Sequence, residues 1–142
     1  MTQVCFYALK EDGRDMQTLA CDLVSQAYTN KQKVAVLCAS QQHAEQFDEL
    51  LWQLPADRFV PHNLSGEGPS SGTPVEVCWQ AQSLGRRTLL VNLSQQMINS
   101  VNSFQHIFDF VPIQEADKQA ARVRYKQFQQ AGCAMQFQAA DN

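Results

Sequence analysis

A basic stripe that contains one aromatic residue is the arrangement in this sequence best suited to chemistry. Its members are Lys118, Arg122, Tyr125, Gln129 and, on the flank, Lys126. At about 100° per residue these side chains share one face of a helix. The cations suit carboxylates, and the tyrosine provides an apolar floor between them. The stripe therefore predicts a site for an acidic peptide end that carries an aromatic residue. The spacing leaves open a solvated helix face.

The helix that carries this basic stripe is predicted between Val111 and Gly132. Pro112 can fix its start, and Gly132 can end it in the left-handed conformation. A mostly alanine side is expected to be buried. That side consists of Ala116, Ala120 and Ala131, with Ala121 and Phe128 on one flank. Arg124 falls among the alanines, so the basic residues do not all share one side of the helix.

Strand-like and helix-like segments alternate along the rest of the chain. Apolar runs predict strands over residues 3–9, 33–38, 74–79, 88–93 and 106–111. Helical spacing follows Asp15, covers residues 41–53, and continues briefly after Ser94. Residues 62–73 are predicted to be a loop, and residues 134–137 an edge strand or a trailing end. This alternation predicts an α/β fold with a mostly parallel sheet flanked by helices.

Length and composition favour a single soluble domain over residues 1–142. No run approaches the roughly 20 apolar residues of a membrane span, so we expect a cytoplasmic protein that does not contact membranes. The net charge of -3 confines any direct binding of DNA to a local patch. The five cysteines are spread along the chain without zinc-site spacing, and we expect them to be reduced.

Catalysis and cofactor binding are not predicted. His43, His62 and His106 have no nucleophile or carboxylate at a spacing that defines a triad. The glycine-rich loop from Gly66 to Gly72 suggests phosphate binding only weakly, because it lacks Gly-Lys-Ser/Thr and does not lead from a strand directly into a helix. We therefore expect no cofactor and no metal.

Two large aromatic residues are not clearly predicted to be part of the hydrophobic core. Trp52 lies off the apolar stripe of its predicted helix, and Phe59 lies on the loop that follows. They can fold back onto the domain or anchor a partner protein, since aromatic residues dominate interface energetics. The sequence leaves both interpretations open.

Several sequence blocks resemble the chi subunit of bacterial DNA polymerase III. They are DELLW (48–52), FVPHNL (59–64), GEGP (66–69), PVE (74–76), DFVP (109–112) and RYK (124–126), with Lys118 and Arg122 between the last two. The resemblance covers nearly the whole chain. It implies a non-catalytic accessory subunit in DNA replication. The implied fold is a compact domain of Rossmann-like topology that lacks a functional nucleotide site.

The resemblance also implies two partners. The acidic C-terminal tail of the single-stranded-DNA-binding protein is expected on the basic helix, at Lys118, Arg122, Tyr125 and Lys126, with Val111 at the edge of the pocket. The psi subunit, which joins the family to the clamp loader, is expected at Trp52 and Phe59. A helicase-like repair protein can take the place of psi at that surface.

Two other functions remain open at this point. A small nucleotide-dependent enzyme or switch would use the Gly66 to Gly72 loop. A direct binder of single-stranded DNA would use Arg86, Arg87 and the basic helix. The acidic balance of the chain argues for little or no direct binding of DNA.

Overall fold

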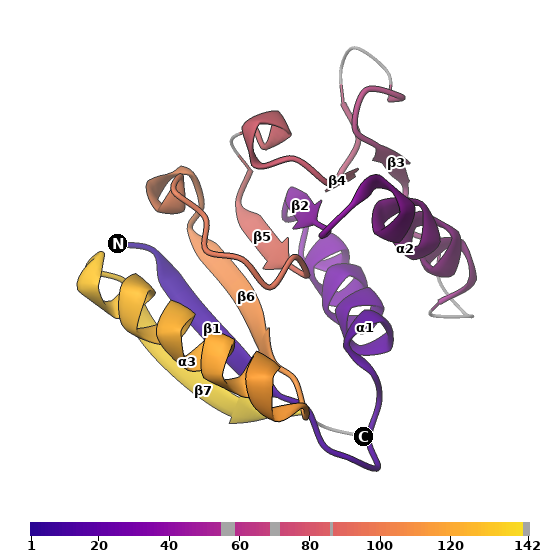
Figure 1. Ribbon diagram of the computed structural model, residues 1–142. Coiled ribbons are helices and arrows are strands. Elements are labelled where there is room, and N and C mark those ends of the chain that lie inside the picture. The colour runs from indigo at the N-terminus through magenta and orange to yellow at the C-terminus, as the bar shows by residue number, and fades with distance from the viewer. Residues whose placement is uncertain (55–58, 69–71, 86, 141–142) are drawn as a thin grey trace.

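One parallel sheet organises the molecule (Figure 1). The computed structural model describes residues 1–54, 59–68, 72–85 and 87–140. Within them, the strands are β1 (Gln3–Ala8), β2 (Val34–Leu37), β3 (His62–Leu64), β4 (Val75–Cys78), β5 (Leu89–Asn92), β6 (His106–Val111) and β7 (Ala134–Ala139). Their order is β3-β4-β2-β5-β6-β1-β7, and every pairing is parallel. The predicted α/β class and parallel sheet are confirmed.

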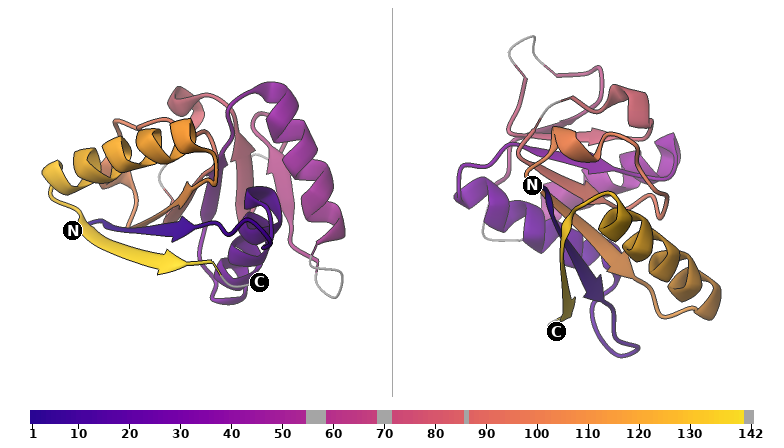
Figure 2. Two further views of the ribbon diagram at one scale, coloured as in Figure 1. Left: turned by 60° about the horizontal axis from the view of Figure 1, so that its bottom comes forward. Right: turned by 90° about the vertical axis from the view of Figure 1, so that its left-hand side faces the viewer.

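Helices cover both faces of this sheet. The core cluster on one face includes Val34 and Val36 of β2 with residues of α1 (Met16–Thr29) and α2 (Gln41–Gln53). The cluster on the other face includes Ala35 and Leu37 with residues of α3 (Glu115–Gln130). Because side chains alternate along a strand, the two clusters lie on opposite faces. Figure 2 (left) shows α3 lying over β1 and β7.

The helix ends follow from local side-chain chemistry. Asp15 caps α1 by accepting a hydrogen bond from the Thr18 N–H at 2.8 Å, as its position predicts. Ser40 caps α2 in the same way, from the His43 N–H at 3.1 Å. Gly132 has a φ of 90° just beyond α3 and turns the chain into β7. Residues 134–139 therefore form an edge strand, the first of the two alternatives.

Two predicted segments differ in the structure. Residues 62–64 were expected in a loop but form β3, which pairs with β4. The helix predicted after Ser94 is wrong, because a 3-10 turn at Val101–Ser103 is its only helical part. Ser94 instead donates from its hydroxyl to Asn92 Oδ1 at 2.6 Å. Ile98, Val101 and Phe104 of the segment are still buried.

The five cysteines form no disulfide bonds. Cys5, Cys21, Cys38 and Cys78 are buried, and Cys133 is partly buried. Burial raises the pKa of the Cys21, Cys38 and Cys78 thiols to about 12, so these thiols act as small apolar groups. In the described ranges, no helix combines the length and apolarity needed to cross a membrane.

Candidate peptide-binding site

Helix α3 contacts the sheet through a narrow stripe. Its buried residues are Ala121, Arg124 and Phe128, at spacings of three and four. The expected burial of Ala121 and Phe128 is confirmed. The expectation for Ala116, Ala120 and Ala131 is wrong, since all three are exposed. Alanine has little apolar surface to lose, so its presence does not define the buried side of a helix. Most of the circumference of α3 is thus left for solvent or for partners.

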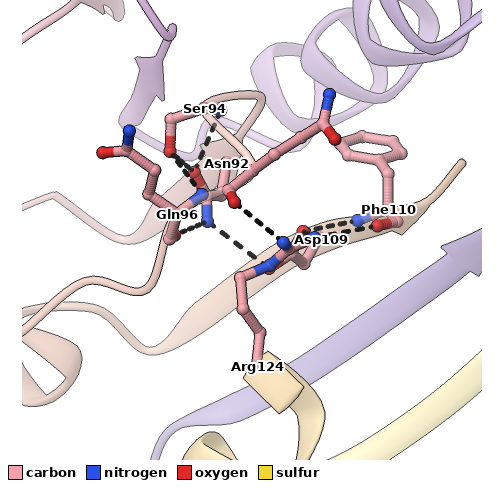
Figure 3. A network of polar contacts seen from close by, with 7 residues as sticks. Asn92, Ser94, Gln96, Asp109, Phe110 and Arg124 are labelled. Carbon is pink, nitrogen blue, oxygen red and sulfur yellow. Dashed lines mark hydrogen bonds and ion pairs between the residues drawn. The ribbon is translucent and has the colours of Figure 1, made fainter. Parts of the chain in front are cut away.

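A buried ion pair fixes the rotation of α3 (Figure 3). Arg124 Nε donates to Asp109 Oδ2 at 2.9 Å, and Arg124 Nη2 donates to Asp109 Oδ1 at 3.1 Å. Arg124 Nη1 also donates to the Gln95 carbonyl at 2.9 Å. Asn92 Nδ2 donates to Asp109 Oδ2 at 3.4 Å. Burial raises the pKa of Asp109, while Arg124, the Phe110 N–H and Asn92 oppose that change.

Sequence reasoning missed this network. Its signals were an arginine among alanines and an aspartate inside the apolar run HIFDFV. A charge on each of two apolar faces indicates a buried pair when the two elements pack together.

A cavity of about 620 Å³ lies between α3 and the ends of β1 and β6. The five residues predicted for the peptide site all line it: Val111, Lys118, Arg122, Tyr125 and Lys126. Gln129, the last member of the basic stripe, is not among the lining residues. The other wall is formed by Phe6, Ala8, Leu9, Pro112 and Phe137. Residues from β1, β6, α3 and β7 thus meet at one site.

The floor of this cavity is aromatic. Tyr125 is partly buried, and its ring centroid lies 5.3 Å from that of Phe6. Phe6 in turn contacts Phe128, with centroids 6.0 Å apart, so Tyr125 stands on the core. Phe137 of β7 is 60% exposed and lies in register with Phe6. Sequence reasoning missed Phe137. The signal that could have found it is that Phe137 is the one aromatic residue after Gly132, in a segment that is mostly alanine and polar residues.

The rim of the cavity is cationic. Lys118, Arg122 and Lys126 line it, and among the residues that the structure describes no aspartate or glutamate does. Arg122 and Lys126 are exposed, so ligand carboxylates reach them without desolvating a buried charge. The arrangement can hold a peptide end that combines negative charge with an apolar group.

Trp52 and Phe59 form a second exposed patch. Their side chains are 52% and 61% exposed, so neither belongs to the core. Their ring centroids lie 5.3 Å apart, and Trp52 also packs on His62 at 4.5 Å. His62 is buried, with Nε2 3.3 Å from Asp48 Oδ1 and Nδ1 2.7 Å from the Val60 carbonyl. The Trp52 ring therefore packs on a buried, hydrogen-bonded histidine, and the Phe59 ring packs on Trp52.

The glycine-rich loop has a structural use. Gly66 and Gly72 have φ values of 86° and 81°. A methyl group on Gly68 would come within 2.5 Å of Asn63 Oδ1, so the close approach requires glycine. The loop leads into β4 rather than into a helix, which leaves it without the helix N-terminus of a phosphate loop. Residues 69–71, and Arg86 of the proposed DNA contact, lie outside the described residues.

Comparisons with known proteins identify the family of this chain. A family model described as "DNA polymerase III chi subunit, HolC" matches residues 1–136. The chain is 37% identical over 138 residues to the DNA polymerase III subunit chi of Escherichia coli (strain K12), covering 93% of this chain and 94% of that protein. It is 42% identical over 129 residues to the Haemophilus influenzae subunit chi, covering 89% and 90%.

A solved structure resembles the fold alone. "The crystal structure of T4 UvsW" matches with a TM-score of 0.66 at 7% identity, over 98% of this chain and 41% of that chain. The relatives at higher identity are named as a polymerase subunit, which confirms the resemblance stated above and the expectation of a replication subunit in place of a free-standing enzyme. The chain belongs to the DNA polymerase III chi subunit family.

Proposed function

We propose that this protein is a bridge in DNA replication. One surface holds the acidic C-terminal tail of the single-stranded-DNA-binding protein, and another holds the psi subunit, which links it to the clamp loader. The observation that carries the proposal is the cavity beneath α3. It combines three cationic side chains with an aromatic floor, and none of its described lining residues is an aspartate or a glutamate.

Five of the residues that line the cavity have assigned roles in the proposed tail complex. Arg122 takes the terminal carboxylate, because its planar fork matches a carboxylate in two hydrogen bonds. Lys118 and Lys126 meet the acidic residues of the tail. Tyr125 and Val111 pack on the aromatic end. The cations are near the surface, so tail binding is modest and salt-sensitive.

The Trp52 and Phe59 patch is proposed to hold psi through apolar contact. Two large exposed rings that contact each other form the kind of centre that dominates interface energetics. Apolar burial changes little with salt, so the two partner contacts differ in their salt dependence.

Replacing Arg122 by alanine is expected to weaken tail binding by about 1.5–3 kcal/mol, the range for a hydrogen bond to a charged group. The measurement is a fluorescence titration with a labelled acidic peptide that ends in a Pro-Phe carboxylate, at low and high salt. The matched control is Lys33→Ala. It removes one positive charge from an exposed position before β2, at the opposite end of the strands.

The control variant should bind the peptide as the unchanged protein does. Absence of binding to the unchanged protein at low salt would remove the tail proposal. Equal losses in Arg122→Ala and Lys33→Ala would place the binding outside the cavity and attribute it to overall charge.

Replacing Trp52 by alanine is expected to weaken psi binding by at least about 2 kcal/mol, the loss typical of a central aromatic anchor. The measurement is calorimetric titration of purified psi at two salt concentrations. Val123→Ala is the control, because Val123 is an apolar residue of α3 that is also exposed. A psi contact as salt-sensitive as the tail contact would contradict the proposal that psi binds by apolar contact and the tail by charge.

A further inference from the structure

A second cavity, with a mostly polar lining, lies where the strands begin, at the opposite end of the strands from the cavity beneath α3. We call this region the strand-start edge. It measures about 550 Å³ and is lined by Lys33, Arg87, Thr88, Asn102, Ser103 and Gln105, with Met1, Thr2 and Phe104. A neighbouring cavity of about 510 Å³ shares Lys33 and adds Lys31. In the described part of the chain, no aspartate or glutamate lines either cavity, although the chain as a whole has a net charge of -3. This strand-start edge is thus locally cationic.

Arg87 is held in place at this edge by the main chain. Its Nη1 donates to the carbonyls of Val34 at 3.2 Å, Thr73 at 2.8 Å and Pro74 at 3.1 Å. Val34 and Pro74 lie at the starts of β2 and β4, so the guanidinium caps two strands. Within the described part of the chain, all hydrogen bonds of the Arg87 side chain come from Nη1. Arg87 also lines the cavity, so its guanidinium is already ordered before a ligand binds there.

We propose that the strand-start edge binds the phosphodiester backbone of single-stranded nucleic acid. Arginine and lysine supply charge to phosphate oxygens, and the Thr88 and Ser103 hydroxyls and the Asn102 and Gln105 amides can add hydrogen bonds. Phe104 is buried, and Tyr28 in the neighbouring cavity is partly buried against the core, so the lining offers little aromatic surface for stacking on a base. The contact is therefore sequence-independent and weak.

The chemistry of this edge differs from that of the tail cavity. The tail cavity has an aromatic floor for an apolar peptide end, whereas the strand-start edge offers polar donors. The two sites lie at opposite ends of β1 and β6, each six residues long, or roughly 20 Å. A protein tail and a nucleic-acid strand can therefore occupy the molecule together. This proposal does not depend on the tail proposal.

The test is fluorescence anisotropy of labelled oligothymidylate at a series of low salt concentrations. Lys33→Gln is expected to weaken binding roughly fivefold, the loss for one surface charge beside a phosphate. It should also reduce the slope of log affinity against log salt by about 0.7, the value for one contact to a single strand. Lys33 is exposed and does not take part in the strand cap, so the variant should keep the fold, as circular dichroism can check.

Arg122→Gln is the matched control, with the same charge change in the tail cavity. It should lose tail-peptide binding and keep oligothymidylate binding, while Lys33→Gln should do the reverse. No binding of oligothymidylate to the unchanged protein, or unchanged binding in Lys33→Gln, would overturn the proposal. Loss of oligothymidylate binding in Arg122→Gln would move the contact to α3 and overturn it as well. Inorganic phosphate that binds as tightly as the oligonucleotide would show a site for the free ion and overturn the assignment to nucleic acid.

Discussion

Replacing Arg124 by methionine is expected to lower the free energy of unfolding by about 3–5 kcal/mol, the cost of leaving a buried charge without its partner. The side chains of Arg124 and Asp109 are 3% and 1% exposed, and two charge-assisted hydrogen bonds join them. Methionine keeps most of the volume of the arginine stem, so the loss reports the ion pair rather than a cavity. Urea denaturation, with the midpoint and the slope both fitted, measures it.

At acidic pH, the difference in unfolding free energy between Arg124→Met and the unchanged protein is expected to be smaller than at neutral pH. Burial raises the pKa of Asp109, and Arg124 is the leading influence that opposes it. Without Arg124 the folded pKa is raised further above the unfolded value. A carboxyl in that position contributes stability below its unfolded pKa and loses it as the pH rises through its folded pKa. The variant should therefore lose more unfolding free energy relative to the unchanged protein as the pH rises from acid to neutral.

Arg122→Met is the matched control for this prediction. It makes the same chemical change two positions away, on an exposed residue of the same helix, and should change stability by less than about 0.5 kcal/mol. A double variant, Arg124→Met with Asp109→Leu, should recover much of the loss, because no unpaired charge remains. Equal destabilisation by Arg124→Met and Arg122→Met would show that the buried pair has no special role.

Phe128→Ala is expected to cost about 3–5 kcal/mol of unfolding free energy, the range for deleting a buried aromatic ring. Phe128 is fully buried and packs edge-on against Phe6. It is one of three buried residues of α3. Its loss should also weaken tail binding, because Tyr125 rests on the same Phe6 ring. Thermal unfolding and the peptide titration together measure both effects.

Phe137→Ala separates the two effects. Phe137 lines the cavity but is 60% exposed. Removal of its ring should leave stability within about 0.5 kcal/mol of the unchanged protein and still weaken the binding of a peptide that ends in an aromatic residue. A Phe128→Ala protein with unchanged stability would contradict the assignment of α3 to the core through this residue.

The buried framework was predictable because parallel strands covered on both faces read as continuous apolar runs. The segments VAVL and LLVN are fully buried, and β2 and β5 fall inside the ranges predicted for them. The bounds of α2 and β6 were predicted to the residue, since capping at Ser40 and an unbroken HIFDFV run mark them locally. In each case the signal lies within the segment itself.

Features that depend on a neighbour were not predictable in the same way. The sequence HNL forms β3 only because β4 lies beside it, since it is short and has two polar residues. The residues after Ser94 have helical spacing, but the side chains of Asn92 and Ser94 bond to each other and to the main chain nearby. The residues predicted on one face of α3 line a cavity, but the opposite wall of that cavity comes from β1 and β7 and could not be read from the helix alone.

The position of β1 has a consequence for the making of the protein. Gln3 lies opposite His106 of β6 on one side and Ala134 of β7 on the other. During synthesis at about 5–20 residues per second, the first strand waits on the order of ten seconds for its neighbours. The described residues that line the cavity beneath α3 belong to β1, β6, α3 and β7 or directly follow β1 and β6, so a nascent chain that ends before β7 lacks part of the cavity. A nascent chain can therefore offer the proposed tail site only after β7 has been synthesised.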